Sequence, residues 1–181
     1  MTRRVVHALF LIFFLLSAYL PAAGAEIVDL TPVIKRGKIL VSFRLTGAFT
    51  EDIERAIASG LPISFRYTVE LKKVRTLWIN KRVAKREILT TVIYDNLTER
   101  YKLSREIDGE LHRTEVLTDP AAMRRFMAEF EALDLFDVSL LEPNGEYYLR
   151  VKGVMKDRNL FLFIPWDIGS GWEKAYFTFL P

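Results

Sequence analysis

Few residues in this chain have the types that carry hydrolytic or metal chemistry. It has two histidines, His7 and His112, and no cysteine. A zinc site needs several imidazole or thiolate ligands, and a nucleophile needs a base beside it. Ser170 lies between Gly169 and Gly171, but that triplet is not the Gly-x-Ser-x-Gly turn that exposes a nucleophilic serine. We therefore expect Ser170 to lie in a flexible loop and His112 to be a surface residue of a strand.

The sequence also lacks the signatures of bound cofactors. It contains no glycine-rich phosphate-binding loop and no dinucleotide-binding fingerprint. Carboxylates are numerous but interspersed with lysine and arginine, so no acid pair is singled out for general acid and base catalysis. We predict a non-enzymatic protein without cofactor or metal, and we keep a hydrolase with an unrecognised carboxylate pair as an alternative.

The most distinctive stretch runs from Lys72 to Arg86 and contains seven basic residues and no acidic one. Trp78 lies in its middle, where the tip of a hairpin is expected. A tryptophan flanked by cations is typical of a membrane contact, because indole favours the headgroup level and cations favour anionic lipid. An acidic protein would also fit, and a solvated hairpin with Trp78 folded onto the core is the alternative. The candidate contact residues are Lys72, Lys73, Arg75, Leu77, Trp78, Ile79, Lys81, Arg82, Lys85 and Arg86.

Two long strands are expected to position that stretch. Apolar and polar residues alternate from Ile63 to Leu71, the period of a strand with one buried face. The alternation slips directly afterwards, where a bulge is expected. A turn near Asn80 returns the chain into a strand over residues 88–94, and Asp108-Gly109 predicts a tight hairpin further along.

Two helices interrupt the strands. Thr50 is expected to cap the first, which ends at Gly60. The second follows Thr118 or Asp119, with Pro120 in its first turn. Its apolar residues recur at helical spacing and are expected to face the core. They are Met123, Phe126, Met127, Phe130 and Leu133.

Residues 26–181 are expected to form one α+β domain. The other strand-like segments are 27–34, 39–45, 101–107, 110–117, 147–155, 160–164 and 175–180, with a hairpin signal at Asn144-Gly145. About eight or nine antiparallel strands with two helices predict a curled antiparallel sheet. A β-sandwich or half-barrel with helical insertions is the alternative.

Residues 1–25 have the three parts of a secretory signal peptide. Arg3 and Arg4 form a basic head, an apolar run extends from Val5 to Leu20, and Ala23-Gly24-Ala25 supplies small residues for cleavage after Ala25. A membrane anchor is the alternative, but the run is shorter than the roughly 20 residues that a spanning helix needs. We expect an exported protein of the periplasm or cell envelope.

Charge and composition narrow the class of partner. Removal of Arg3 and Arg4 lowers the formal net charge from +3 to +1, and an exported protein of near-zero charge is a poor candidate for nucleic-acid binding. We expect a binding or accessory module that contacts a membrane protein or the membrane surface. A carrier or sensor of an apolar ligand, held against Met123 and Met127, is the second possibility.

The chain resembles domain-of-unknown-function family 4390, a family of exported bacterial proteins. The resemblance rests on the segment Ala56–Ile63, on Trp78, and on the segment Tyr94–Tyr101. It implies no activity, cofactor or catalytic residue. Genes of the family often lie near a membrane sensor kinase of the nitrogen-regulation type, which implies such a kinase as a partner.

Overall fold

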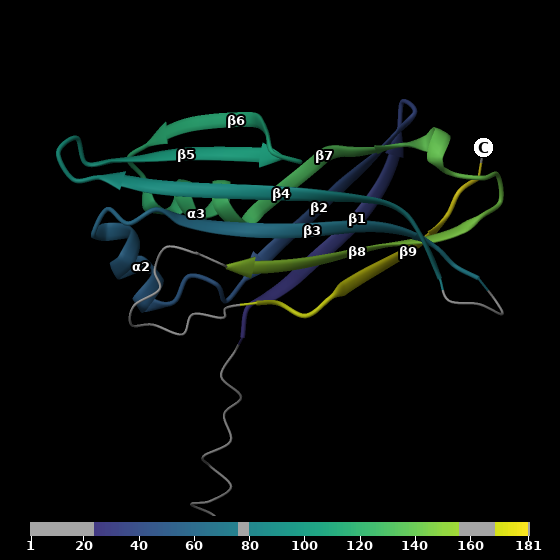
Figure 1. Cartoon of the computed structure of the whole chain (residues 1–181), viewed down its shortest axis with the longest axis horizontal. Helices are drawn as coiled ribbons and strands as arrows, with labels where there is room; N and C mark the ends of the chain where they lie inside the picture. The colour runs from purple at the N-terminus through teal and green to yellow at the C-terminus, as the bar shows by residue number, and fades with distance from the viewer. Residues whose placement is uncertain (1–23, 76–79, 156–168, 181) are drawn as a thin grey trace, which may run out of the picture.

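The computed structural model describes residues 24–75, 80–155 and 169–180, and these form an α+β fold (Figure 1). Nine antiparallel strands of the described residues divide between a six-stranded sheet, order β6-β5-β4-β3-β8-β9, and a three-stranded sheet, order β1-β2-β7. The elements are β1 (Glu26–Lys35), β2 (Lys38–Thr46), α2 (Glu51–Ala58), β3 (Ile63–Lys73), β4 (Lys81–Asp95), β5 (Arg100–Ile107), β6 (Glu110–Leu117), α3 (Pro120–Ala128), β7 (Glu129–Asp137), the 3-10 helix η1 (Val138–Leu140), β8 (Glu146–Met155) and β9 (Glu173–Thr178). The α+β prediction is confirmed, and the predicted strand over 160–164 lies outside the described residues.

The two sheets pack face to face around one core. β1 and β2 run diagonally behind β3 and β4 (Figure 1). Tyr67 of β3 and Phe130 of β7 are buried, and their rings meet edge to face with centroids 4.8 Å apart. A side chain at Gly153 of β8 would place its Cβ 3.2 Å from Tyr67 and 3.3 Å from Leu45. A side chain there would push these neighbours by a few tenths of an ångström, so glycine favours the close approach of the two sheets.

Local turn and cap chemistry sets several elements as predicted. The Thr50 hydroxyl accepts a hydrogen bond from the Ile53 N–H at 3.4 Å, which caps α2. Asp108 and Gly109 have φ values of 52° and 85°, the left-handed pair that a two-residue hairpin turn requires. The Asn144-Gly145 hairpin prediction is wrong, because the strands on either side, β7 and β8, lie in different sheets.

The second helix is shorter than the sequence predicts. α3 ends at Ala128, so Phe130 and Leu133 belong to β7 and not to the helical stripe. Both residues are still buried, because β7 pairs with β2 through Phe43↔Phe130 and Val41↔Leu133. Strand pairing with β2 overrides the helical spacing of these residues, since tertiary context routinely outweighs local preference.

A buried polar cluster receives the C-terminal end of α3. The hydroxyls of Tyr67 and Thr90 donate to the Met127 carbonyl at 2.8 and 3.1 Å. The Arg105 guanidinium donates to the carbonyls of Phe126 and Glu129. These donors satisfy carbonyls that lose their helical partners where α3 stops. Burial lowers the pKa of Arg105 to about 10 and raises the pKa of Tyr67.

The first described strand starts at the predicted cleavage site. β1 begins at Glu26, directly after Ala25, and forms one edge of the three-stranded sheet. A bulge between Val28 and Thr31, followed by Pro32, blunts this edge against pairing with other chains. Over the described ranges, no helix combines the length and apolar character needed to cross a bilayer.

Candidate functional site: the outer face of the six-stranded sheet

The β3–β4 hairpin divides the predicted basic stretch between two faces of the sheet. Lys72, Arg82 and Lys85 lie on the face that points away from the core, as the alternation along β3 and β4 requires. Leu77, Trp78 and Ile79 lie outside the described residues, so their predicted exposure at the tip stays a prediction.

Other cations of the stretch make structural contacts at the side or base of the hairpin. Arg86 donates to the Leu135 carbonyl of β7 at 3.0 Å and pairs with Asp108 at 2.8 Å, so it ties the two sheets together. Lys73 pairs with Glu142 at 2.5 Å. That hydrogen bond lowers the pKa of Glu142, and the charges of Lys81 and Arg75 add to the effect. Arg75 and Lys81 are themselves exposed.

Strand register places the outward residues of four strands in rows. The first row is Tyr176, Tyr148, Lys72 and Arg82, from β9, β8, β3 and β4. The second is Lys174, Arg150, Glu70 and Lys85. Lys152, Thr68 and Glu87 form the third, and Val154, Arg66 and Leu89 the fourth.

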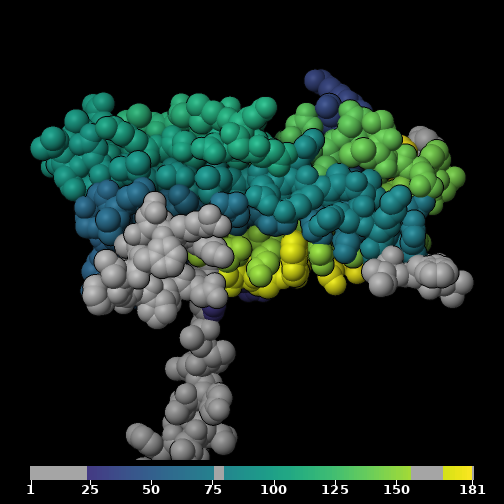
Figure 2. Space-filling view, in the orientation of Figure 1, coloured from purple at the N-terminus to yellow at the C-terminus, as the bar shows by residue number. Residues whose placement is uncertain are grey.

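We call this outward surface of β4, β3, β8 and β9 the basic face. In these four rows, two carboxylates, Glu70 and Glu87, lie among seven cations, and the next outward position of β8 adds an exposed carboxylate, Glu146, opposite Thr178. The cations are Arg66, Lys72, Arg82, Lys85, Arg150, Lys152 and Lys174. In the space-filling view β9 lies along the lower border of this face, below β3 and β4 (Figure 2). The four strands therefore join into one surface with a clear excess of positive charge.

Sequence reasoning missed four of the seven cations of this surface, Arg66 and three residues far along the chain. Arg150, Lys152 and Lys174 lie 64 to 88 residues beyond Arg86, the end of the basic stretch, and come beside it only through the pairing of β8 with β3 and β9. For Arg150 and Lys152 the one available signal was their alternation with apolar residues in β8, which marks outward positions without saying which strand lies next to them.

The most deeply buried charge of the basic face is Glu70. Its side chain is 6% exposed and accepts from Arg150 Nε at 2.7 Å, with Arg150 Nη2 at 2.6 Å and Arg82 Nη1 at 3.3 Å. Burial acts to raise the pKa of Glu70, but the hydrogen bonds from Arg150 and Arg82 outweigh burial and lower it. Trp172 covers Arg150, with the guanidinium carbon 4.1 Å from the ring centroid. One carboxylate thus fixes two arginines from different strands.

Aromatic rings border the cations at the β9 edge. Tyr148 and Tyr176 lie with ring centroids 5.2 Å apart, and the Lys174 ammonium is 5.9 Å from the Tyr148 ring. Tyr176 is 66% exposed and Trp172 is 37% exposed. This edge therefore presents aromatic surface and positive charge together.

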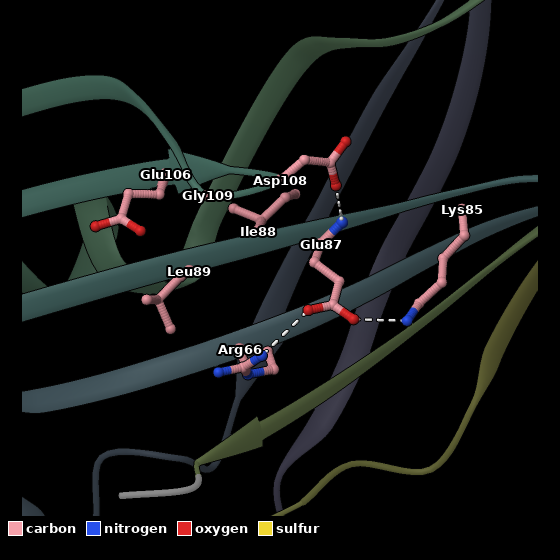
Figure 3. A pocket seen from close by; sticks show the side chains of 8 residues that line it. All are labelled: Arg66, Lys85, Glu87, Ile88, Leu89, Glu106, Asp108 and Gly109. Carbon is pink, nitrogen blue, oxygen red and sulfur yellow. Dashed lines mark hydrogen bonds and ion pairs between the residues drawn. The ribbon is translucent and has the colours of Figure 1, made fainter.

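The second carboxylate, Glu87, lies in an open hollow nearer β5 (Figure 3). Glu87 accepts from Lys85 at 2.5 Å and from Arg66 at 3.1 Å, and its backbone N–H donates to Asp108 at 2.8 Å. The hydrogen bond from Lys85, more than any other contact, lowers the pKa of Glu87. The hollow has a volume of about 480 Å³ and is lined largely by charged side chains.

The residues first considered for catalysis are separated by the sheet. His112 is exposed on β6 at one edge of the six-stranded sheet, while Ser170 adjoins β8 near the other. Ser170 is buried rather than in a free loop, and its hydroxyl accepts from the Gly153 N–H at 2.9 Å. In the described part of the chain, no group of three His, Asp or Glu side chains is arranged to hold a metal ion.

Comparison with known proteins identifies a family. No curated protein and no solved structure matches the chain. The sequence model described as Domain of unknown function (DUF4390) matches residues 22–175, which include every strand of the basic face except the last residues of β9. This match covers most of the sequence, and the chain belongs to the DUF4390 family.

Proposed function

We propose that this protein is a non-enzymatic module of the bacterial cell envelope that docks on an anionic membrane surface through its basic face. The observation that carries the proposal is the gathering of seven cations on one sheet face, where the same strands present three carboxylates, Glu70, Glu87 and Glu146. Attraction to anionic lipid contributes about 1 kcal/mol for each Lys or Arg near the surface, so such a face can hold a protein at the bilayer.

The aromatic border favours a membrane over an acidic protein as the partner. Trp172 and Tyr176 are exposed beside Arg150 and Lys174. Tryptophan and tyrosine are enriched at the headgroup level of membranes, where one part of the ring is apolar and the other is wet. The basic face therefore offers both kinds of group that an anionic membrane surface attracts.

The proposal includes export and cleavage after Ala25. Residues 1–25 have the composition of a signal peptide. Cleavage there would leave β1 whole, because β1 begins at Glu26. An N-terminus at Glu26, found by mass spectrometry of protein from the cell envelope, is the expected result, and an intact leader in the membrane fraction would contradict it.

Neither alternative function gains comparable support. Met123 and Met127 are 3% and 0% exposed and pack in the core, which favours a structural role for both over an adaptable ligand pocket. Glu70 and Glu87 of the basic face are each held by two cations, in contrast to the acid pair that glycoside hydrolysis needs.

Vesicle binding tests the proposed function. The protein comprising residues 26–181 should bind phosphatidylglycerol-containing vesicles, ignore pure phosphatidylcholine vesicles, and dissociate as salt is added, because charges are screened over about 8 Å at physiological ionic strength. Reversal of two face charges, Lys152→Glu with Lys174→Glu, should weaken binding at least tenfold.

The matched control reverses two cations of the β1–β2 turn. Lys35→Glu with Arg36→Glu changes the net charge equally, but these exposed residues lie on the three-stranded sheet. Equal loss in both variants would show that net charge alone drives binding. A wild-type protein that ignores anionic vesicles would overturn the membrane proposal and direct attention to an acidic protein partner.

A further inference from the structure

Glu70 organises the centre of the basic face. It is buried between β4 and β8, and its carboxylate is shared by Arg82 and Arg150. A carboxylate in this position lowers the positive charge of the face, so it works against simple attraction to an anionic surface. Any contribution of Glu70 to binding must therefore come from its contacts with Arg82 and Arg150.

The ion pairs leave part of each guanidinium unoccupied. Arg150 uses Nε and Nη2 for Glu70, and Arg82 uses Nη1. Among the described residues, Arg150 Nη1 and the Nε and Nη2 of Arg82 have no hydrogen-bond acceptor. Trp172 lies against the Arg150 guanidinium and restricts its rotation. The two arginines are held in place and keep donors for a further acceptor.

The surroundings of these donors match a phosphate group. Lys72 is paired with Arg82 in the first row, and Lys174 is paired with Arg150 in the second. Guanidinium groups bind phosphate oxygens through directed N–H donors, and nearby ammonium groups add charge with little directional demand. Ordering both arginines before binding lowers the conformational entropy lost when the anion arrives.

We propose that Arg82 and Arg150, positioned by Glu70 and flanked by Lys72 and Lys174, form a phosphate-binding site that takes the headgroup phosphate of an anionic lipid. The inference rests on the proposed function, because it gives the docking surface a specific anchoring site. Glu70 acts as a positioning residue, and Trp172 holds Arg150 in its orientation.

Two isosteric substitutions distinguish this site from charge attraction alone. Glu70→Gln and Glu87→Gln each remove one negative charge from the same face. If charge alone governs binding to phosphatidylglycerol vesicles, both variants bind up to about fivefold more tightly. If Glu70 positions the two arginines, Glu87→Gln still binds more tightly but Glu70→Gln binds at least threefold more weakly than wild type.

A second variant keeps the test decisive if Glu70→Gln fails to fold. Trp172→Ala leaves the charge of the face unchanged and alters a partly exposed side chain. Trp172 is also one of the aromatic residues proposed to lie at the headgroup level, so the loss of its ring weakens vesicle binding with or without a phosphate site. The deciding measurement is therefore the shift of the Arg150 Nε–H signal at saturating phosphatidylglycerol vesicles, which the positioning model expects to be smaller in Trp172→Ala than in wild type. An Arg150 Nε–H shift equal to wild type in Trp172→Ala, or tighter vesicle binding in Glu70→Gln, overturns the phosphate site while leaving the docking proposal intact.

NMR distinguishes the sources of phosphate. Titration with glycerol 3-phosphate and, separately, with phosphatidylglycerol vesicles should shift the side-chain Nε–H signals of Arg82 and Arg150. Shifts with both show a site for the phosphate group itself, and shifts with vesicles alone show a site completed by the bilayer. Signals that respond to neither probe overturn the inference, whereas failure of wild-type vesicle binding overturns the proposed function beneath it.

Discussion

Two buried charges, one on each face of the six-stranded sheet, are neutralised in different ways. Arg105 is 6% exposed on the core side, and its hydrogen bonds go to the backbone carbonyls of Phe126 and Glu129. Glu70 is 5% exposed on the outer side and is held by the side chains of Arg82 and Arg150. The first charge is matched by fixed backbone dipoles, and the second by two arginine side chains of the outer face.

The difference separates a charge that holds the fold together from one that arranges a surface. Arg105 joins α3, β5 and β7, and its ring neighbours Phe126 and Phe130 lie 4.8 and 4.4 Å from the guanidinium carbon. Loss of Arg105 should therefore affect stability. Loss of an arginine beside Glu70 should affect what the outer face binds, since Arg82 is 59% exposed. The following substitutions test this contrast.

The largest effect is expected from Phe126→Ala. Phe126 is 7% exposed and lies beneath Arg105, so the change removes both core packing and the ring against the guanidinium. Urea unfolding should show a loss of about 3–5 kcal/mol in the free energy of unfolding. Arg124→Ala, on the exposed side of α3, should cost under about 1 kcal/mol, because its ion pair with Glu54 is half-exposed. Equal losses would mean that the apolar stripe of α3 is not core.

Arg105→Met compared with Arg82→Met tests the contrast directly. Methionine at position 105 removes the donor to one buried carbonyl, that of Phe126, and to one half-buried carbonyl, that of Glu129, and a buried group left unsatisfied costs about 1–3 kcal/mol. We expect a loss of about 2 kcal/mol or more for Arg105→Met and less than about 1 kcal/mol for Arg82→Met, because Arg150 still pairs with Glu70. Chemical denaturation of the two variants measures both values. The opposite order would contradict the division between a structural and a surface charge.

A smaller loss is expected from Tyr67→Phe. The change removes one of the two hydroxyl donors to the Met127 carbonyl, and Thr90 keeps the other. The loss should be about 1 kcal/mol. Tyr176→Phe removes a hydroxyl from an exposed ring and should leave stability unchanged. A double variant with Thr90→Val should lose more than the sum of the single changes, and simple additivity would show that the two hydroxyls act independently.

The smallest effect is a pH dependence due to Glu70. Its folded-state pKa is lowered, so its stabilising contribution is complete above the unfolded pKa of about 4.3 and is lost as pH falls through the lower folded value. Wild type should therefore lose more stability than Glu70→Gln between pH 6 and pH 2.5. Thermal unfolding at both pH values measures the difference. An equal loss of stability at low pH in the two proteins would show that the ion pairs of Glu70 with its arginines do not stabilise the folded state.

Several elements could be predicted because their causes are local. Thr50 caps α2, Asp108-Gly109 closes the β5–β6 hairpin, and the alternation from Ile63 to Leu71 forms the inward face of β3. The end of α3 could not be predicted in this way. The spacing of Phe130 fits a helix, and only pairing with β2 makes it a strand residue.

Local sequence patterns predict even less of the candidate site than of the fold. The basic stretch was evident in the sequence, and Lys72, Arg82 and Lys85 do lie on the outer face. Arg86 was included with them, yet it faces the other way and binds the Leu135 carbonyl. The face of the sheet to which a side chain points follows from its place in the alternation along the strand. The bulge beside Leu71 shifts this alternation between the residues on its two sides.

By itself, the sequence determined the family, the α+β class, the turns and the residues able to form an inward face, because each depends on neighbours along the chain. The tertiary structure decided that Glu70 is buried, which arginines hold it, and that Trp172 lies against one of them. Those facts depend on the register between strands separated by up to about 100 residues, and register is fixed by packing of the common core rather than by any local pattern.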